Sequence, residues 1–140
     1  MESGVSSRSQ NIGILIIRLG LGFFFFFFHG WTKLLGGPDT WTALGQNMHL
    51  FGIHFYPVFW GFASACTEFL AGILIFLGLF FRPATFFLTL NMLVASVSMV
   101  HSGAQLYTYP IEIGIVIFGL LIAGPGKYSL DRWRSIRRYS

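Results

Sequence analysis

The sequence predicts an all-α integral membrane protein folded as a bundle of four transmembrane helices. Of its 140 residues, 54% are hydrophobic and only 10% are charged, and the apolar residues are gathered into four long segments. Soluble domains carry roughly 25% charged residues, so this composition excludes a soluble monomer. A hydrocarbon core about 30 Å thick requires about 20 helical residues per crossing, which leaves room for one four-helix domain over residues 11–124.

The four apolar segments lie at about 11–31, 55–81, 83–101 and 110–123. The last one stops at Gly124-Pro125-Gly126, a strong helix terminator. Its roughly 14 residues cover only about 21 Å at 1.5 Å per residue. We therefore expect this helix to begin earlier, through residues 105–109, or to have its outer end covered by other parts of the chain.

The connection over residues 32–54 is the part of the chain best placed to cover the outer end of that helix. Four apolar residues recur there at helical spacing, Trp41, Leu44, Met48 and Phe51, and Asp39 is a possible helix cap. This pattern predicts an amphipathic helix at the membrane surface, with a mobile loop as the alternative. Residues 1–10 are expected to be flexible, and residues 125–140 to form a basic tail.

The cations are distributed unevenly between the two sides of the predicted bundle. With four spans both termini share one side, which holds seven cations: Arg8, Arg82, Lys127, Arg132, Arg134, Arg137 and Arg138. The other side holds Lys33 alone. The positive-inside rule therefore places both termini in the cytoplasm and the protein in the cytoplasmic (inner) membrane. The basic tail suits an anionic lipid leaflet, and we expect no nucleic acid as a partner.

Five ionisable residues lie within the apolar segments: Arg18, His29, Glu68, His101 and Glu112. Such groups are costly in lipid, usually face the bundle interior and often mark functional sites. In a regular helix Arg18 and His29 differ by about 20° around the axis, and Lys33 follows one turn later. Glu68 shares its face with small residues, which favour helix contacts, so we expect it to face protein with Arg18 or His29 as its cation.

These residues predict a polar cavity that opens outward. His29, Glu68 and Glu112 are the expected proton donors and acceptors. The expected binding residues are Arg18, Lys33, His101, Trp31 and Trp60, the two tryptophans being placed to sandwich a planar ring. Such a set suits the two oxygens of a quinone or quinol head group. One alternative is that the charges only fix the helix register.

Haem and metal are the other candidates for this cluster. His29 and His101 are candidate axial ligands of a haem, which is a further alternative to the quinone. No metal site is predicted, since neither carboxylate helix has the ExxH spacing. The lone Cys66 excludes an internal disulfide, a CxxC redox pair and a cysteine-based iron–sulfur site.

Several short motifs resemble the DoxX family of small bacterial and archaeal membrane proteins. They are Arg18-Leu-Gly-Leu-Gly22, His29-Gly-Trp-Thr-Lys-Leu34, Glu68-x3-Gly72, Gly78-Leu-Phe-Phe-Arg82-Pro83, Glu112 and Gly124-Pro-Gly-Lys-Tyr-Ser-Leu-Asp131. The resemblance implies a four-helix membrane protein and, through founding members, a link to the small subunit of a thiosulfate:quinone oxidoreductase or terminal quinol oxidase. It places Arg18, His29, Lys33, Glu68 and Glu112 at polar positions of the family, and Gly124, Tyr128 and Asp131 in its C-terminal signature.

The leading hypothesis is a subunit of a quinone-linked membrane redox complex that binds quinone, quinol or a similar lipophilic molecule. Its expected partners are the lipid bilayer and other membrane or soluble redox subunits. Whether the chain is itself an oxidoreductase is left open. The alternatives are a non-enzymatic membrane scaffold or solute-handling protein that recruits soluble partners, and a bis-histidine haem protein.

Overall fold

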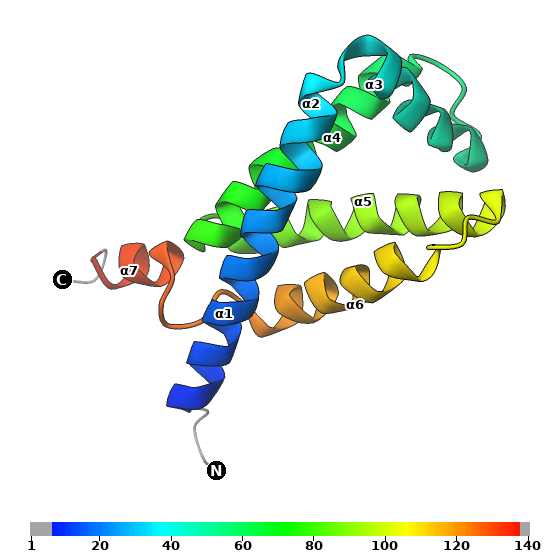
Figure 1. The fold of residues 1–140 in the computed structure, drawn as a ribbon. Helices are drawn as coiled ribbons and strands as arrows, with labels where there is room; N and C mark the ends of the chain where they lie inside the picture. The colour runs from blue at the N-terminus through cyan, green and yellow to red at the C-terminus, as the bar shows by residue number, and fades with distance from the viewer. Residues whose placement is uncertain (1–6, 138–140) are drawn as a thin grey trace.

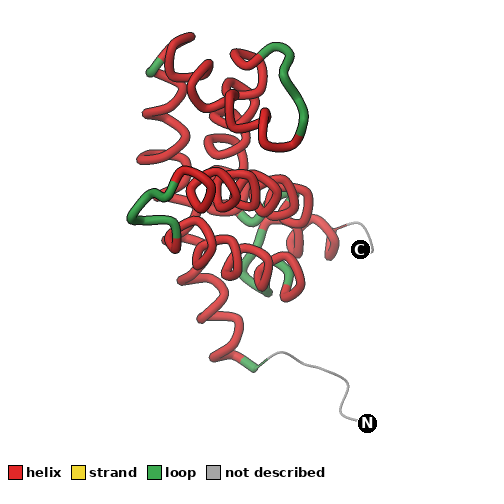
Figure 2. The backbone as a smooth tube through the Cα atoms, turned by 90° about the vertical axis from the view of Figure 1, so that its right-hand side faces the viewer, coloured by secondary structure: helices red, strands yellow, loops and turns green. Residues whose placement is uncertain are grey.

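The computed structural model describes residues 7–137, and within that range every regular element is a helix (Figures 1 and 2). The first rod is continuous and consists of α1 (Arg8–Phe24), the π-helix η1 (Phe25–Gly30) and α2 (Trp31–Leu35). It is followed by α4 (Pro57–Leu77), α5 (Phe81–Ser102) and α6 (Thr108–Ala123). The rod, α4 and α5 are long and apolar enough to cross a membrane, and α6 is a shorter apolar helix. The predicted all-α membrane fold is confirmed.

The first helix begins at Arg8, about three residues earlier than expected, because Ser7 caps it. The Ser7 hydroxyl accepts a hydrogen bond from the Gln10 backbone N–H at 3.3 Å, and the Ser7 N–H donates to Gln10 Oε1 at 2.8 Å. This reciprocal capping box satisfies two backbone donors at once. Residues 8–10 therefore belong to the rod, and residues 1–6 of the expected flexible segment lie outside the described residues.

The run of six phenylalanines leads into a π-helix over Phe25–Gly30. The Trp31 N–H donates to the carbonyl of Phe26, five residues back instead of four. This turn therefore contains one residue more than a regular helical turn. The extra residue rotates the side chains that follow by about 100° around the helix axis. The difference of about 20° that a regular helix predicts between Arg18 and His29 therefore does not apply here.

The helices form two pairs, the rod with α4 and α5 with α6, joined where α4 meets α5 (Figure 1). The rod and α4 approach closely at Gly22, where an added Cβ would lie 2.6 Å from the Phe76 backbone nitrogen and 2.7 Å from the Gly72 carbonyl oxygen. A single apolar core spans both pairs. Its buried members are Phe25, Ala71, Ile75, Phe81, Ala84, Leu88, Met92, Ile117 and Leu120.

The connection after the rod is helical, as its amphipathic pattern predicts. It consists of α3 (Gly37–Gly45) and the 3-10 helix η2 (Gln46–Phe51), with Asp39 in the first turn of α3 and not at its cap. Its main contacts are with α4 and α5, and not with the outer end of α6 as expected. α6 instead gains length by starting at Thr108, two residues before Pro110.

Three segments meet at the end of the molecule where α1 begins. The Asp131 carboxylate, at the start of α7 (Leu130–Arg137), accepts the backbone N–H groups of Phe80 and Phe81 at 3.0 and 2.9 Å, and so caps α5. The Lys127 N–H donates to Asn11 Oδ1 at 2.8 Å, which ties the same turn to the start of α1. The two ends of the described chain therefore lie at the same end of the helix array. Part of the expected basic tail is helical, and Arg138 lies outside the described residues.

Candidate functional site

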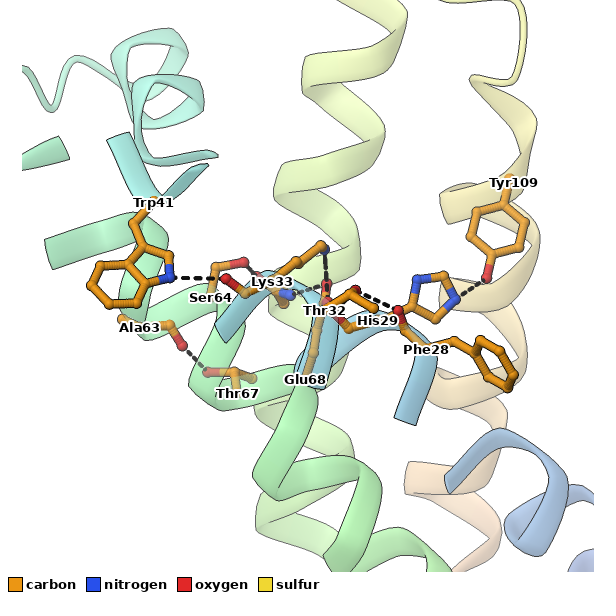
Figure 3. Close-up of polar contacts among 11 residues, drawn as sticks. Phe28, His29, Thr32, Lys33, Trp41, Ala63, Ser64, Thr67, Glu68 and Tyr109 are labelled. Carbon is orange, nitrogen blue, oxygen red and sulfur yellow. Dashed lines mark hydrogen bonds and ion pairs between the residues drawn. The ribbon is translucent and has the colours of Figure 1, made fainter. Parts of the chain in front are cut away.

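A buried polar network joins the rod, α4 and α5 (Figure 3). Lys33 Nζ donates to Glu68 Oε1 at 2.7 Å and lies at the same distance from Oε2. Asn91 Nδ2 donates to Oε1 at 2.9 Å, and the Ser64 hydroxyl donates to Asn91 Oδ1 at 2.8 Å. The Glu68 side chain is 2% exposed and that of Lys33 is 28% exposed. A buried carboxylate is stable only if it is paired and hydrogen bonded, and this network meets both conditions.

Three elements position the four members of the network. Lys33 follows the π-helix, and its carbonyl accepts a hydrogen bond from Trp41 Nε1 at 2.9 Å, which ties α2 to α3. Ser64 and Glu68 lie one turn apart on α4, and Asn91 lies in the middle of α5. The three helices therefore converge on one carboxylate.

A pocket of about 380 Å³ lies beside this network, between α4, α5 and the α3–η2 connection. Its polar lining comes from Lys33, Asn47, Ser64, Thr67, Glu68 and Asn91. Aromatic and aliphatic side chains, among them Trp60, Phe87 and Leu90, form the rest of the wall. Its volume falls within the range typical of small-molecule sites, roughly 300–1,000 Å³.

His29 belongs to a second, separate contact. Its Nε2 lies 2.9 Å from the Tyr109 hydroxyl, which joins η1 to α6. In Figure 3 the His29 ring points toward Tyr109, while Lys33 and Glu68 point toward each other. His29 does not line the pocket. The structure therefore separates the hydrogen bond of His29 from the Lys33–Glu68 pair, although the sequence predicted one cluster.

Arg18 forms a third contact, at the end of the molecule where α1 begins. It is 2% exposed, and its guanidinium donates to the carbonyls of Pro125 at 2.8 Å and Tyr128 at 2.6 Å. The expectation that Arg18 or His29 is the cation hydrogen bonded to Glu68 is wrong, because Lys33 holds that position. The π-helix alters the alignment of the rod, and the turn after α6 supplies oxygens to Arg18 instead.

The remaining predicted residues lie apart from one another. Trp60 lines the pocket, whereas Trp31 is 46% exposed and packs its ring 5.9 Å from that of Phe69. His101 and Glu112 are exposed in the single chain. The face of α6 that carries Glu112 is open and has no protein packed on it, as its exposed neighbours Thr108, Val116 and Gly119 show.

Sequence reasoning selected neither Asn91 nor Asn47 as a site residue. An amide in the middle of an apolar span was the available signal for Asn91. Asn47 gave a weaker signal, because polar residues are ordinary in a surface connection. Its Oδ1 accepts the Ser98 hydroxyl at 2.7 Å, which fixes the amide at the edge of the pocket.

The profile of the DoxX family matches residues 13–102, which is more than half of the chain. The chain belongs to the DoxX family. The matched range of this DoxX protein contains Lys33, Glu68 and Asn91, and it ends with α5. The turn that binds Arg18 lies beyond it. No curated protein and no solved structure matches the sequence.

Proposed function

We propose that this DoxX protein binds a quinone, or a lipophilic ring molecule of similar size, in the pocket beside Lys33 and Glu68. The observation that carries this proposal is the pairing of a charged hydrogen-bonding network with an apolar wall in one pocket of about 380 Å³. Small-molecule sites typically combine a few fixed polar groups with an apolar lining of this kind.

The chain's own residues have distinct parts in this proposal. The ammonium of Lys33, on a side chain that is 28% exposed, donates to an oxygen of the bound ring. The carboxylate of Glu68 balances the positive charge of Lys33. The pair therefore has no net charge and suits an uncharged ligand that carries polar oxygens. Trp60 and Phe87 pack against the ring, and the Ser64–Asn91 contact fixes the carboxylate.

We place this binding activity within a quinone-linked membrane redox assembly. The family resemblance described above supports this role, and the pocket supplies a place for the lipid-soluble reactant. In this proposal the DoxX protein holds the ring and its partner subunits carry the electrons.

Filling the pocket tests the binding proposal. Ala95 lines the pocket and is not a member of the polar network, so Ala95→Phe adds a ring there while the charged and hydrogen-bonding groups are kept. We expect purified Ala95→Phe protein to bind a decyl-substituted benzoquinone at least about tenfold more weakly than the unmodified protein, a change of about 1.4 kcal/mol, by isothermal titration calorimetry. Ala123→Phe, on the exposed end of α6, is the matched control and should bind normally. Equal affinities of Ala95→Phe and unmodified protein would reject the pocket as the site.

The redox role is tested in native membranes. With thiosulfate as the electron donor, which the family resemblance suggests, membranes from cells that lack the protein should reduce added decyl-benzoquinone more slowly than membranes that contain it. Unmodified protein should restore the rate, and Ala95→Phe should not. Restoration of the rate by both proteins would show that the redox role does not depend on the pocket.

A further inference from the structure

We propose that the pocket selects the oxidised, carbonyl form of its ligand over the reduced, hydroxyl form. This inference rests on the proposed function and concerns its specificity. A carbonyl oxygen only accepts hydrogen bonds, whereas a hydroxyl also brings a hydrogen that needs an acceptor. The form that binds more tightly is therefore decided by which donors and acceptors the pocket leaves open.

The strong acceptors in the pocket are already engaged. Glu68 Oε1 accepts from both Lys33 and Asn91, whereas Glu68 Oε2 accepts no hydrogen bond but is buried, 2.7 Å from the same ammonium, and so is closed to a ligand. The amide oxygens of Asn91 and Asn47 accept the hydroxyls of Ser64 and Ser98, respectively. Within residues 7–137, the pocket therefore offers no carboxylate or amide oxygen that lacks a close polar contact.

The two hydroxyl groups in the lining do not change this balance. Ser64 donates its hydrogen to Asn91, and Thr67 donates its hydrogen to the Ala63 carbonyl at 2.8 Å. Their remaining lone pairs are neutral acceptors. Hydrogen bonds with one charged partner are roughly twice as strong as those between neutral groups, so a contact with the Lys33 ammonium outweighs one with either hydroxyl.

Donors, by contrast, remain open. The Lys33 ammonium carries three hydrogens, its only described acceptor is Glu68, and its side chain is 28% exposed. Asn91 uses one amide hydrogen for Glu68, and the described hydrogen bonds of Asn47 involve only its oxygen. A carbonyl oxygen meets these donors directly, whereas a hydroxyl would leave its own hydrogen without a strong acceptor.

The test compares the two forms of one ligand. Oxidised decyl-benzoquinone and the corresponding hydroquinone are titrated anaerobically into the purified protein by calorimetry. We expect the oxidised form to bind roughly five- to tenfold more tightly, since an unmatched donor in a buried site weakens binding by about this factor.

A matched pair of variants assigns the selectivity to the pocket. Asn47→Asp keeps the oxygen that accepts from Ser98 and replaces the amide donor with an acceptor, so the affinity ratio should fall toward one. Gln46→Glu makes the same chemical change at the preceding, exposed residue outside the pocket, and should leave the ratio unchanged.

The outcomes separate the inference from the proposed function. Equal affinities, or tighter binding of the hydroquinone, would overturn the selectivity while the binding proposal stands. An unchanged ratio in Asn47→Asp would also overturn it. Binding of neither form would reject both proposals together.

Discussion

Glu68 is the residue around which the candidate site is built. A carboxylate that is 2% exposed loses nearly all contact with water, and a lysine and an asparagine from two other helices replace that contact. Removing one partner of such a pair leaves a buried charge without compensation, which is more damaging than removing both charges. The site and the stability of the fold therefore depend on the same side chains.

Replacement of Lys33 tests this dependence. Lys33→Met leaves the Glu68 carboxylate buried and unpaired, and we expect it to lower the free energy of unfolding by about 3–5 kcal/mol. The double variant Lys33→Met/Glu68→Gln should recover a large part of this loss. The measurement is thermal or denaturant unfolding in detergent. Lys127→Met, outside the network, is the control, and an equal loss there would contradict the assignment.

His29 is predicted to act outside the pocket. His29→Phe removes the contact with Tyr109, which should lower stability by about 1 kcal/mol, the typical net value of one hydrogen bond. The affinity for decyl-benzoquinone should stay within twofold of the unmodified value, taken as an order-of-magnitude bound on a remote change. Loss of binding by a protein that remains folded would show that His29 belongs to the binding site.

At the scale of the elements, close helix crossings at glycine define the packing. Gly22 touches the backbone of α4, whereas Gly13, on the same helix, has no atom within 4 Å of an added Cβ. The two positions allow one substitution to be compared in two environments.

We expect Gly22→Ala to destabilise the fold by about 1–3 kcal/mol, because the added methyl group pushes the rod away from α4. Gly13→Ala should be neutral or stabilising by up to about 1 kcal/mol, since alanine favours the helix. Both are measured by the same unfolding experiment in detergent. A smaller effect at Gly22 than at Gly13 would contradict the observed crossing.

The elements themselves were largely predictable, and the site was predictable only in part. Apolar segments and terminators such as Gly124-Pro125-Gly126 located the helices to within a few residues, and the small residues beside Glu68 correctly predicted that it faces protein. The π-helix was not predictable, because six identical phenylalanines present the same side chain in every direction. The assignment of Arg18 or His29 as the cation of Glu68 failed because the Lys33 side chain reaches that carboxylate, whereas Arg18 and His29 bond to the turn after α6 and to Tyr109.

At the scale of the whole molecule, the two ends of the array differ in charge. The start of α1, the α4–α5 turn and α7 lie together and carry Arg8, Arg82 and Arg134, among other cations. Lys33 lies toward the other end of the rod, where its charge is paired with Glu68. Positive charge is therefore concentrated at the end that holds both termini of the described chain.

This asymmetry predicts that the end bearing α7 faces the cytoplasm. In a Cys66→Ala background, single cysteines at the exposed positions Ser9 and Gln46 report on the two ends. An impermeant maleimide should label Gln46→Cys in intact cells, and Ser9→Cys only after the membrane is opened. The reverse pattern would show the opposite orientation.

The sequence separation between Arg18 and its acceptors has a consequence for biosynthesis. The carbonyls of Pro125 and Tyr128 lie 107 and 110 positions further along the chain, so the ribosome makes them only after the rod, α4, α5 and α6 have been synthesised. Until then the guanidinium has to remain near the hydrated membrane surface, because an unsolvated cation in hydrocarbon is costly. A nascent chain released before this turn has no means of enclosing Arg18. We expect chains truncated before residue 125 to be degraded in the membrane, because enclosure of Arg18 requires the turn after α6.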